Sequence, residues 1–315
     1  MRIALLSSRR YAASALLAGL VGLLAAGCGA PSAAAPASVS AGPIKIVGDN
    51  HVTLTLKHPA HRLIVIEPSN FEIVDVLGLR SDIVGVDASV PTYTPAPWSH
   101  AAHGLPTVGS AIPAVSPERI AARRPDLVIA SAGVSGLSGL KALGIPVLIL
   151  EPSTIAGVYH DIVLVGEATG RTSRATRLVA ALKRQVRALE ARVRTTRSRP
   201  AVFYDLGGLY TGGRGSFISS LITLAGGRDV ADSMSTEEWP QVTAEQVVAA
   251  NPDYILVDPS GGTAAAERQI PGFSATTAGK QHHILAVPDS SYLDQPSVGL
   301  VRGLQELIAI LHPKI

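Results

Sequence analysis

The segment SPERIAARRPDLVIA, residues 116–130, returns in outline as TAEQVVAANPDYILV, residues 243–257. Each copy starts with a hydroxyl residue and a nearby glutamate, continues to Pro-Asp, and ends in an apolar run rich in valine, isoleucine and leucine. This order is typical of a short helix that stops at the Xaa-Pro-Asp sequence and passes directly into a buried strand. A chain that contains this unit twice is expected to contain two αβ lobes.

The two copies share their helix-start signals. Ser116 is expected to cap the first helix ahead of a proline at the first helical position, and Thr243 and Gln246 have the spacing of a capping box in the second. Glu118 and Glu245 fall in the first turn, where a carboxylate offsets the helix dipole. That role alone explains a glutamate at each position, and a second role as an exposed contact for a partner stays open.

The same alternation of helix and strand extends through most of the chain. Residues 62–86, RLIVIEPSNFEIVDVLGLRSDIVGV, predict a buried strand, a helix ending at Gly78 and a second strand, and the pattern resumes after Pro200. Between them lies a long amphipathic helix with apolar residues every three or four positions: Leu178, Leu182, Val186, Leu189 and Val193. We therefore predict an α/β protein with mostly parallel sheets in two lobes, 44–170 and 200–315, joined by a single bridging helix at 171–199.

The N-terminus indicates export. Arg2, Arg9 and Arg10 precede the apolar run AASALLAGLVGLLAAG, which is shorter than the roughly 20 residues of a spanning helix. The run ends at Cys28, the only cysteine of the chain. We predict a signal peptide at 1–27 and, at 28–43, an Ala/Pro/Ser-rich tether without a fold of its own.

Charge argues against a nucleic-acid partner. Of the 27 Lys and Arg residues, three lie in the predicted signal, so the mature chain has 24, equal to its 24 Asp and Glu. The basic solvent face of the long helix carries no interleaved aromatics, which favours an ordinary solvated face. With one cysteine, intramolecular disulfides are excluded, and the fold depends on its core.

The order of motifs resembles a transport family. HRLIVIEPSNFEIVDVLG (61–78), the two repeated units, GLYTGGRGSFISSLITLAGG (208–227), WPQVTAEQ (239–246) and VRGLQELIAILHP (301–313) are similar to the substrate-binding lipoproteins of ABC importers for iron-siderophores, haem and vitamin B12. The resemblance covers roughly residues 44–315, and WPQVTAEQVV is most similar to the vitamin B12-binding protein. It implies a helical-backbone, class III periplasmic-binding-protein fold with the ligand between the lobes, and no catalytic role.

The resemblance also implies partners and a location. LLAAGC (23–28) resembles a lipobox, so Cys28 is the expected lipidation site, and the exported protein is expected on the outer face of the cytoplasmic membrane. Glu118 and Glu245 fall at the family's docking positions, one per lobe, where they would pair with arginines of an ABC permease dimer that works with ATPase subunits. The cargo implied is a small cobalt- or iron-containing chelate bound by a monomer, with no other cofactor.

Four aromatic residues are the expected ligand contacts. Trp239 and Tyr210 fall where the vitamin B12-binding relative carries aromatics at its ligand, and Tyr93 and Tyr292 lie in loops at strand ends, where the cleft is expected. YLDQPSVGLV (292–301) replaces an Arg-Pro-Gly-Pro-Arg stretch of many relatives. Arg214 and Arg228 are the substitutes that the chain offers for an anionic ligand.

Two other functions remain open at this point. A free transition metal would be bound by histidines, which occur in three close pairs, and haem would be bound through a tyrosine or histidine ligand. The pairs are His58 and His61, His100 and His103, and His282 and His283. An αβ enzyme is the remote alternative. YTGGRGS (210–216) lacks the Gly-Lys-Ser/Thr ending of a phosphate loop, and no Gly-Xaa-Ser-Xaa-Gly motif occurs in the chain.

Overall fold

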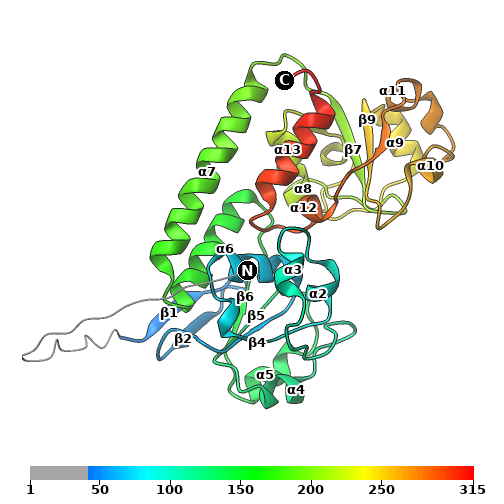
Figure 1. The fold of residues 1–315 in the computed structure, drawn as a ribbon. Helices are drawn as coiled ribbons and strands as arrows, with labels where there is room; N and C mark the ends of the chain where they lie inside the picture. Colours follow the sequence, from blue (N-terminus) through cyan, green and yellow to red (C-terminus); the bar gives the residue numbers. More distant parts are fainter. Residues whose placement is uncertain (1–41) are drawn as a thin grey trace, which may run out of the picture. The chain divides into compact units, whose positions relative to one another are not determined.

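The computed structural model describes residues 42–315, which Figure 1 shows with the element labels used below. The predicted signal peptide, Cys28 and nearly all of the predicted tether lie outside the described residues. Among the helices that are described, none is both long enough and apolar enough to cross a membrane.

The N-terminal sheet has four parallel strands in the order β4-β3-β5-β6. These strands are β3 (Leu63–Val65), β4 (Ile83–Val86), β5 (Leu127–Ala130) and β6 (Val147–Ile149). The central strands β3 and β5 are buried at every residue, as expected for a parallel sheet covered on both faces. The helices of this lobe are α1 (Pro68–Val76), α2 (Ser89–Tyr93), α3 (Ser99–Ala102), α4 (Pro117–Ala122), α5 (Leu137–Ala142) and α6 (Ile155–Ala168).

An antiparallel hairpin precedes this sheet. It consists of β1 (Ile44–Val47) and β2 (Thr53–Leu56), and the helix–strand alternation of the sequence does not predict it. β1 contacts α6, so the hairpin is attached to the N-terminal lobe.

The C-terminal sheet is also parallel, with the order β10-β9-β7-β8. Its strands are β7 (Ala201–Asp205), β8 (Arg228–Asp229), β9 (Tyr254–Val257) and β10 (Ile284–Ala286). Its helices are α8 (Phe217–Leu224), α9 (Ala244–Ala250), α10 (Ala264–Glu267), α11 (Thr277–Lys280), α12 (Ser291–Asp294) and α13 (Leu300–Leu311). Numbered within each lobe, both sheets have the strand order 2-1-3-4, and the repeated units form the helix and third strand of each: α4 with β5, and α9 with β9.

The predicted bridging helix is α7 (Thr172–Arg194), which lies between the two sheets in sequence and packs against α6 and α13 (Figure 1). Its 23 residues extend about 35 Å at the usual helical rise. Of the predicted apolar stripe, Leu182, Val186, Leu189 and Val193 are buried, and Leu178 is partly buried. The opposite face is polar and basic, so the spacing of apolar residues alone determines how this helix is oriented.

The core is continuous between the lobes. One cluster of buried apolar side chains includes Val65 of β3, Leu182 of α7, Val202 of β7 and Leu304 of α13. Two smaller clusters fill the other face of each sheet. A shared core of this kind resists a large change in the angle between the lobes, because the packed helices would have to separate.

Candidate ligand-binding cleft

The repeated units adopt the predicted caps. The Ser116 hydroxyl accepts a hydrogen bond from the backbone N–H of Arg119 at 3.3 Å, and Thr243 and Gln246 form a complete capping box. Glu118 and Glu245 are both exposed in the first turn of their helices. Hydrogen bonds from their own backbone N–H groups, with further bonds to the cap hydroxyls, hold the pKa of both carboxyls below the usual value. Each therefore presents a carboxylate to solvent at neutral pH.

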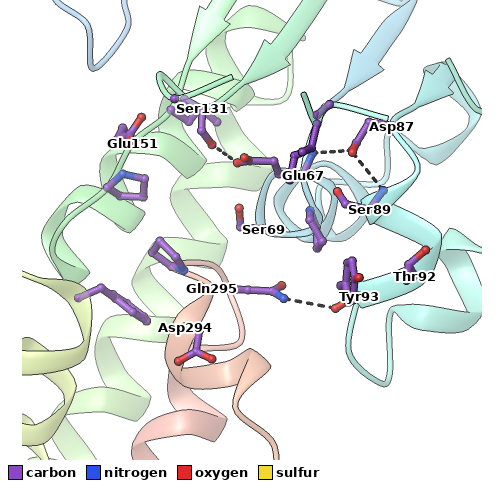
Figure 2. A pocket seen from close by; sticks show the side chains of 18 of the residues that line it. Glu67, Ser69, Asp87, Ser89, Thr92, Tyr93, Ser131, Glu151, Asp294 and Gln295 are labelled. Carbon is purple, nitrogen blue, oxygen red and sulfur yellow. Dashed lines mark hydrogen bonds between the residues drawn. The ribbon is translucent and has the colours of Figure 1, made fainter. Parts of the chain in front are cut away.

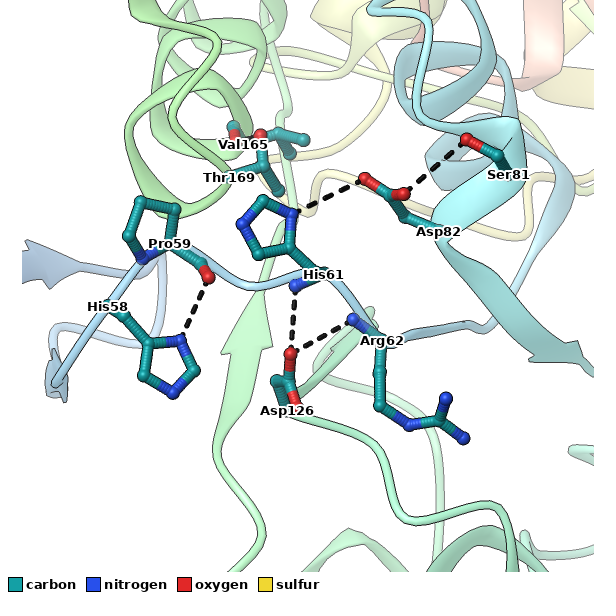
Figure 3. Close-up of polar contacts among 9 residues, drawn as sticks. All are labelled: His58, Pro59, His61, Arg62, Ser81, Asp82, Asp126, Val165 and Thr169. Atoms are coloured by element: carbon teal, nitrogen blue, oxygen red, sulfur yellow. Dashed lines mark hydrogen bonds and ion pairs between the residues drawn. The ribbon is translucent and has the colours of Figure 1, made fainter.

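The Pro-Asp sequence has a structural task in both lobes. Asp126 accepts hydrogen bonds from the backbone N–H groups of His61 and Arg62 at 2.8 and 3.0 Å, next to the start of β3 (Figure 3). Asp253 accepts one from the N–H of Ala201, at the start of β7, at 2.7 Å. Each aspartate thus joins the start of its lobe's third strand to the start of the first, which explains this half of the repeat by the fold alone.

A cavity of about 710 Å³ opens at the carboxyl ends of the strands. Residues that follow each of the four N-terminal strands line it: Glu67 after β3, Asp87 after β4, Ser131 after β5 and Glu151 after β6. The C-terminal lobe contributes Phe217 at the start of α8, the pair Glu238–Trp239, and Asp294–Pro296 at the end of α12. Ligands of open parallel sheets bind at these strand ends, especially between the first and third strands, where the order reverses.

Glu67 occupies that switch point. Its carboxylate accepts a hydrogen bond from the Ser131 hydroxyl, so the pair joins the ends of β3 and β5 across the floor of the cavity (Figure 2). Its backbone is unusual, with φ 76° and ψ 146°, a conformation that only glycine adopts without strain. Asp87 fixes this conformation by accepting a hydrogen bond from the Glu67 N–H at 2.9 Å. Burial raises the pKa of the Glu67 carboxyl, and the hydrogen bond from Ser131 opposes that shift.

Asp294, the last residue of α12, is a carboxyl that the C-terminal lobe contributes to the cavity. It accepts a hydrogen bond from the hydroxyl of the buried Tyr204 at 2.9 Å. Burial raises the pKa of Asp294 to about 8, and the neighbouring carboxylate of Asp258 adds to the shift. The adjacent Gln295 donates a hydrogen bond to the backbone carbonyl of Tyr93 at 3.3 Å and so connects α12 to α2 of the other lobe (Figure 2).

The predicted aromatic contacts separate into two groups. Tyr93 and Trp239 line the cavity and are 65% and 39% exposed, which leaves both rings accessible to a ligand. Tyr210 is exposed, and its backbone pairs with Gln241, two residues after Trp239. Tyr210 does not line the cavity. Tyr292 is 2% exposed, and its hydroxyl donates to the carbonyl of Ala96, so the structure uses this ring for packing between the lobes rather than at the cavity surface.

Ile112 was not anticipated from the sequence. Its side chain is 84% exposed and lines the cavity, together with Tyr93 and Trp239. A ligand that covered Ile112 together with these two aromatic rings would gain free energy from the apolar area removed from water. The signal was present in SAIPAV (110–115), an apolar pair between a serine and a proline that belongs to no predicted helix or strand.

The histidine pairs lie outside the cavity lining. The rings of His58 and His61 turn in different directions, the first to the carbonyl of Pro59 and the second to Asp82 (Figure 3). His103 bonds to the carbonyl of Ser99, and His283 stacks on Tyr254. Within residues 42–315 no group of three or more histidine, cysteine or acidic side chains is arranged to hold a metal ion.

A family comparison identifies the fold. The profile described as periplasmic binding protein matches residues 63–290, most of the described chain and both sheets. The chain belongs to the periplasmic binding protein family. This family consists of binding components of transport systems, and the resemblance inferred from the sequence motifs is confirmed.

Individual relatives align with most of the chain. A Bacillus subtilis (strain 168) protein named as an uncharacterized ABC transporter substrate-binding lipoprotein is 27% identical over 93% of this chain and 95% of its own length. A cobalamin-binding protein of Halobacterium salinarum is 29% identical over 84% of this chain and 72% of its own length.

Solved structures agree with the predicted class of fold. The periplasmic heme-binding protein of Roseiflexus sp. RS-1 superposes with a TM-score of 0.71 at 28% identity, covering 81% of this chain and 98% of that structure. A structure from Saccharomonospora viridis described as an ABC-type Fe3+-hydroxamate transport system has a TM-score of 0.71 at 27% identity, covering 86% and 99%. These proteins share one α/β architecture and differ in the cargo that their names state.

Proposed function

We propose that this periplasmic binding protein captures a metal chelate, either a corrinoid or a ferric siderophore, and delivers it to an ABC permease dimer. The observation that supports this most directly is the cavity lined by residues that follow the N-terminal strands and by residues of the C-terminal lobe, with the exposed side chains of Tyr93, Ile112 and Trp239 around it. Apolar rings beside a few directed polar groups suit a large organic ligand better than a bare ion. The names of the cobalamin- and hydroxamate-related relatives agree with this cargo.

Fluorescence titration tests the capture step. The chain has two tryptophans, so a Trp98→Phe variant leaves Trp239 as the single reporter at the cavity. Cyanocobalamin, ferric hydroxamates and haemin are titrated into the soluble protein lacking residues 1–28, with calorimetry to separate binding from light absorption by the ligand. Saturable quenching by cyanocobalamin or by the ferric hydroxamates supports the proposal. If only haemin binds, the cargo is haem instead. No binding by a folded protein would overturn it.

Delivery is assigned to Glu118 and Glu245. Both are exposed, ionised and presented at equivalent places in the two lobes, so a two-fold permease could contact both at once. Exposed ion pairs are individually weak, and we expect them to set orientation and encounter rate more than affinity. The double variant Glu118→Gln/Glu245→Gln should bind cargo normally but stimulate the cognate permease–ATPase complex poorly. Glu190→Gln on α7 is the matched control, and equal stimulation by both proteins would contradict the assignment.

Membrane attachment is assigned to Cys28, after removal of residues 1–27, on the outer face of the cytoplasmic membrane. The lipoprotein name of the Bacillus relative supports this. Expressed from its full-length gene, the protein should partition into detergent and carry a diacylglycerol mass at its N-terminus, and Cys28→Ser should abolish both. An unmodified wild-type protein would exclude the anchor.

A further inference from the structure

We propose that the cleft selects chelates of neutral or positive net charge and rejects chelates that carry free carboxylates. This inference rests on the proposed capture of a metal chelate and names the chemical class of that cargo. It follows from the side chains that face the cavity, which differ in charge from the rest of the molecule.

Five carboxyl side chains line the cavity, and among the described residues its lining includes no lysine, arginine or histidine. The acidic residues are Glu67, Asp87, Glu151, Glu238 and Asp294; the carboxylate of Asp87 is buried and accepts hydrogen bonds from the N–H groups of Glu67 and Ser89. Arg214 and Arg228, the two arginines that the sequence offered for an anionic ligand, lie elsewhere, and Arg214 donates to the backbone carbonyl of Asp232. A bound anion would therefore lose its hydration without gaining a countercharge.

The carboxyl groups come from both lobes. Figure 2 shows Glu67, Asp87 and Glu151 along one side of the pocket and Asp294 on the opposite side. The C-terminal lobe also contributes Glu238, so a ligand between the lobes meets acidic residues of both lobes, and a carboxylate on the ligand would be repelled without finding a countercharge. A chelate with amide N–H or ammonium groups at its edge finds hydrogen-bond acceptors there.

Two of these groups can also serve a neutral ligand. Burial raises the pKa of Glu67, and it raises that of Asp294 to about 8, so Asp294 is largely protonated at pH 7. A protonated carboxyl carries no charge, so it does not repel the polar oxygens of a neutral chelate as a carboxylate would. The cleft therefore offers hydrogen-bond acceptors and a largely uncharged carboxyl, but no fixed positive charge.

Glu67 is the specificity-determining residue in this scheme. Its backbone conformation would suit glycine, yet the chain places a glutamate there, at the switch point of the sheet and hydrogen-bonded to Ser131. The surrounding structure maintains the strain through the bond from the Glu67 N–H to Asp87. Strain retained at a ligand cavity is the pattern expected where the side chain, rather than the backbone, is needed.

Two matched series of probes test the charge rule. Ferrioxamine B carries one free ammonium group, its N-acetyl derivative is neutral there, and its N-succinyl derivative carries a carboxylate, with the ferric hydroxamate unchanged. Aquocobalamin, cyanocobalamin and a cyanocobalamin monocarboxylic acid form the corresponding corrinoid series. Affinities are measured by calorimetry at pH 7 and at two ionic strengths.

In whichever series binds, we expect the cationic member to have the highest affinity, the neutral member a lower one and the carboxylated member the lowest. One unit charge facing carboxylates across a partly solvated cleft should change affinity by roughly five- to thirtyfold, less at high salt. Glu67→Gln and Glu151→Gln should each reduce the difference in affinity between the cationic and the carboxylated probe. Glu190→Gln on α7 should leave that difference unchanged. Haemin, with two propionates, should bind more weakly than either neutral chelate.

The outcomes separate the two proposals. If the carboxylated members bind as tightly as the cationic ones, or haemin binds most tightly, the charge rule is wrong and the capture function stands. If a folded protein binds no member of either series, the chelate-capture function fails and the charge rule fails with it.

Discussion

Replacing Glu67 by glycine should make the protein more stable than replacing it by alanine. Both changes remove the same carboxylate and the same hydrogen bond to Ser131. They differ in the backbone, because alanine must still adopt φ 76° and ψ 146°, at a cost of about 1–3 kcal/mol. Glycine avoids that cost but loses about 0.5–1 kcal/mol more conformational entropy on folding than alanine does. The net expectation is a free energy of unfolding about 1 kcal/mol higher for Glu67→Gly than for Glu67→Ala, or roughly 2–4 °C in Tm.

The two variants should nevertheless lose cargo affinity equally, because affinity depends on the carboxylate that both lack. Urea denaturation and thermal unfolding give the stabilities, and the chelate titrations give the affinities. Glu67→Gln serves as the control that keeps the shape of the side chain and its hydrogen bond to Ser131. A glycine variant no more stable than the alanine variant would refute the strain argument. Unequal affinity losses would show that the backbone, rather than the side chain, serves the ligand.

Three further changes test other parts of the structure. Trp239→Ala should weaken cargo binding by about tenfold or more without altering Tm, as expected for a half-exposed aromatic contact, and an unchanged calorimetric affinity would remove this residue from the site. Glu72, which lies buried between the lobes and accepts a hydrogen bond from Ser297 at 2.7 Å, has its pKa raised by burial to about 8. The folded protein therefore holds this proton more tightly than the unfolded chain, and the free energy of unfolding falls as pH rises from about 4.5 to about 8. The Glu72→Gln variant should show a weaker dependence of stability on pH. In urea titrations its free energy of unfolding should exceed that of the wild type by about 1–3 kcal/mol at pH 8, with little difference at pH 4. Asp253→Ala should cost about 2 kcal/mol in unfolding free energy because it leaves the N–H of Ala201 without its acceptor, and a loss below 0.5 kcal/mol would argue against this role for the repeated aspartate.

Long elements with clear periodicity were predictable from the sequence. The spacing of apolar residues fixed the orientation of α7, and the cap residues located the starts of α4 and α9. Short elements were not predictable in this way, because β8 has two residues and α12 has four, which is too few for a periodic pattern of apolar residues to appear. Tyr292 is an example: the sequence predicts a loop there, whereas the residue lies in α12 and its ring packs inward.

The β1–β2 hairpin was missed for a different reason. TLTL (53–56) does alternate apolar and hydroxyl residues, and GDNH (48–51) is a plausible turn, but the segment follows the tether and precedes the first αβ unit. In the structure β1 packs against α6, more than 100 residues away in sequence. Such tertiary support cannot be inferred from a window of a few residues.

The acidic lining of the cleft shows most clearly what the sequence conceals. The sequence predicts a formally neutral mature chain, and this neutrality argues against a nucleic-acid partner but says nothing of the charge at a binding site. The fold separates these charges, because α7 exposes a row of arginines while the turns after β3, β4 and β6 place acidic residues at one cavity. Nothing in the local sequence of each turn indicates that these residues meet, and only the parallel arrangement of the strands brings their ends to the same edge. Net charge therefore describes the solubility of this protein, whereas the topology of its sheets determines the charge that a ligand encounters.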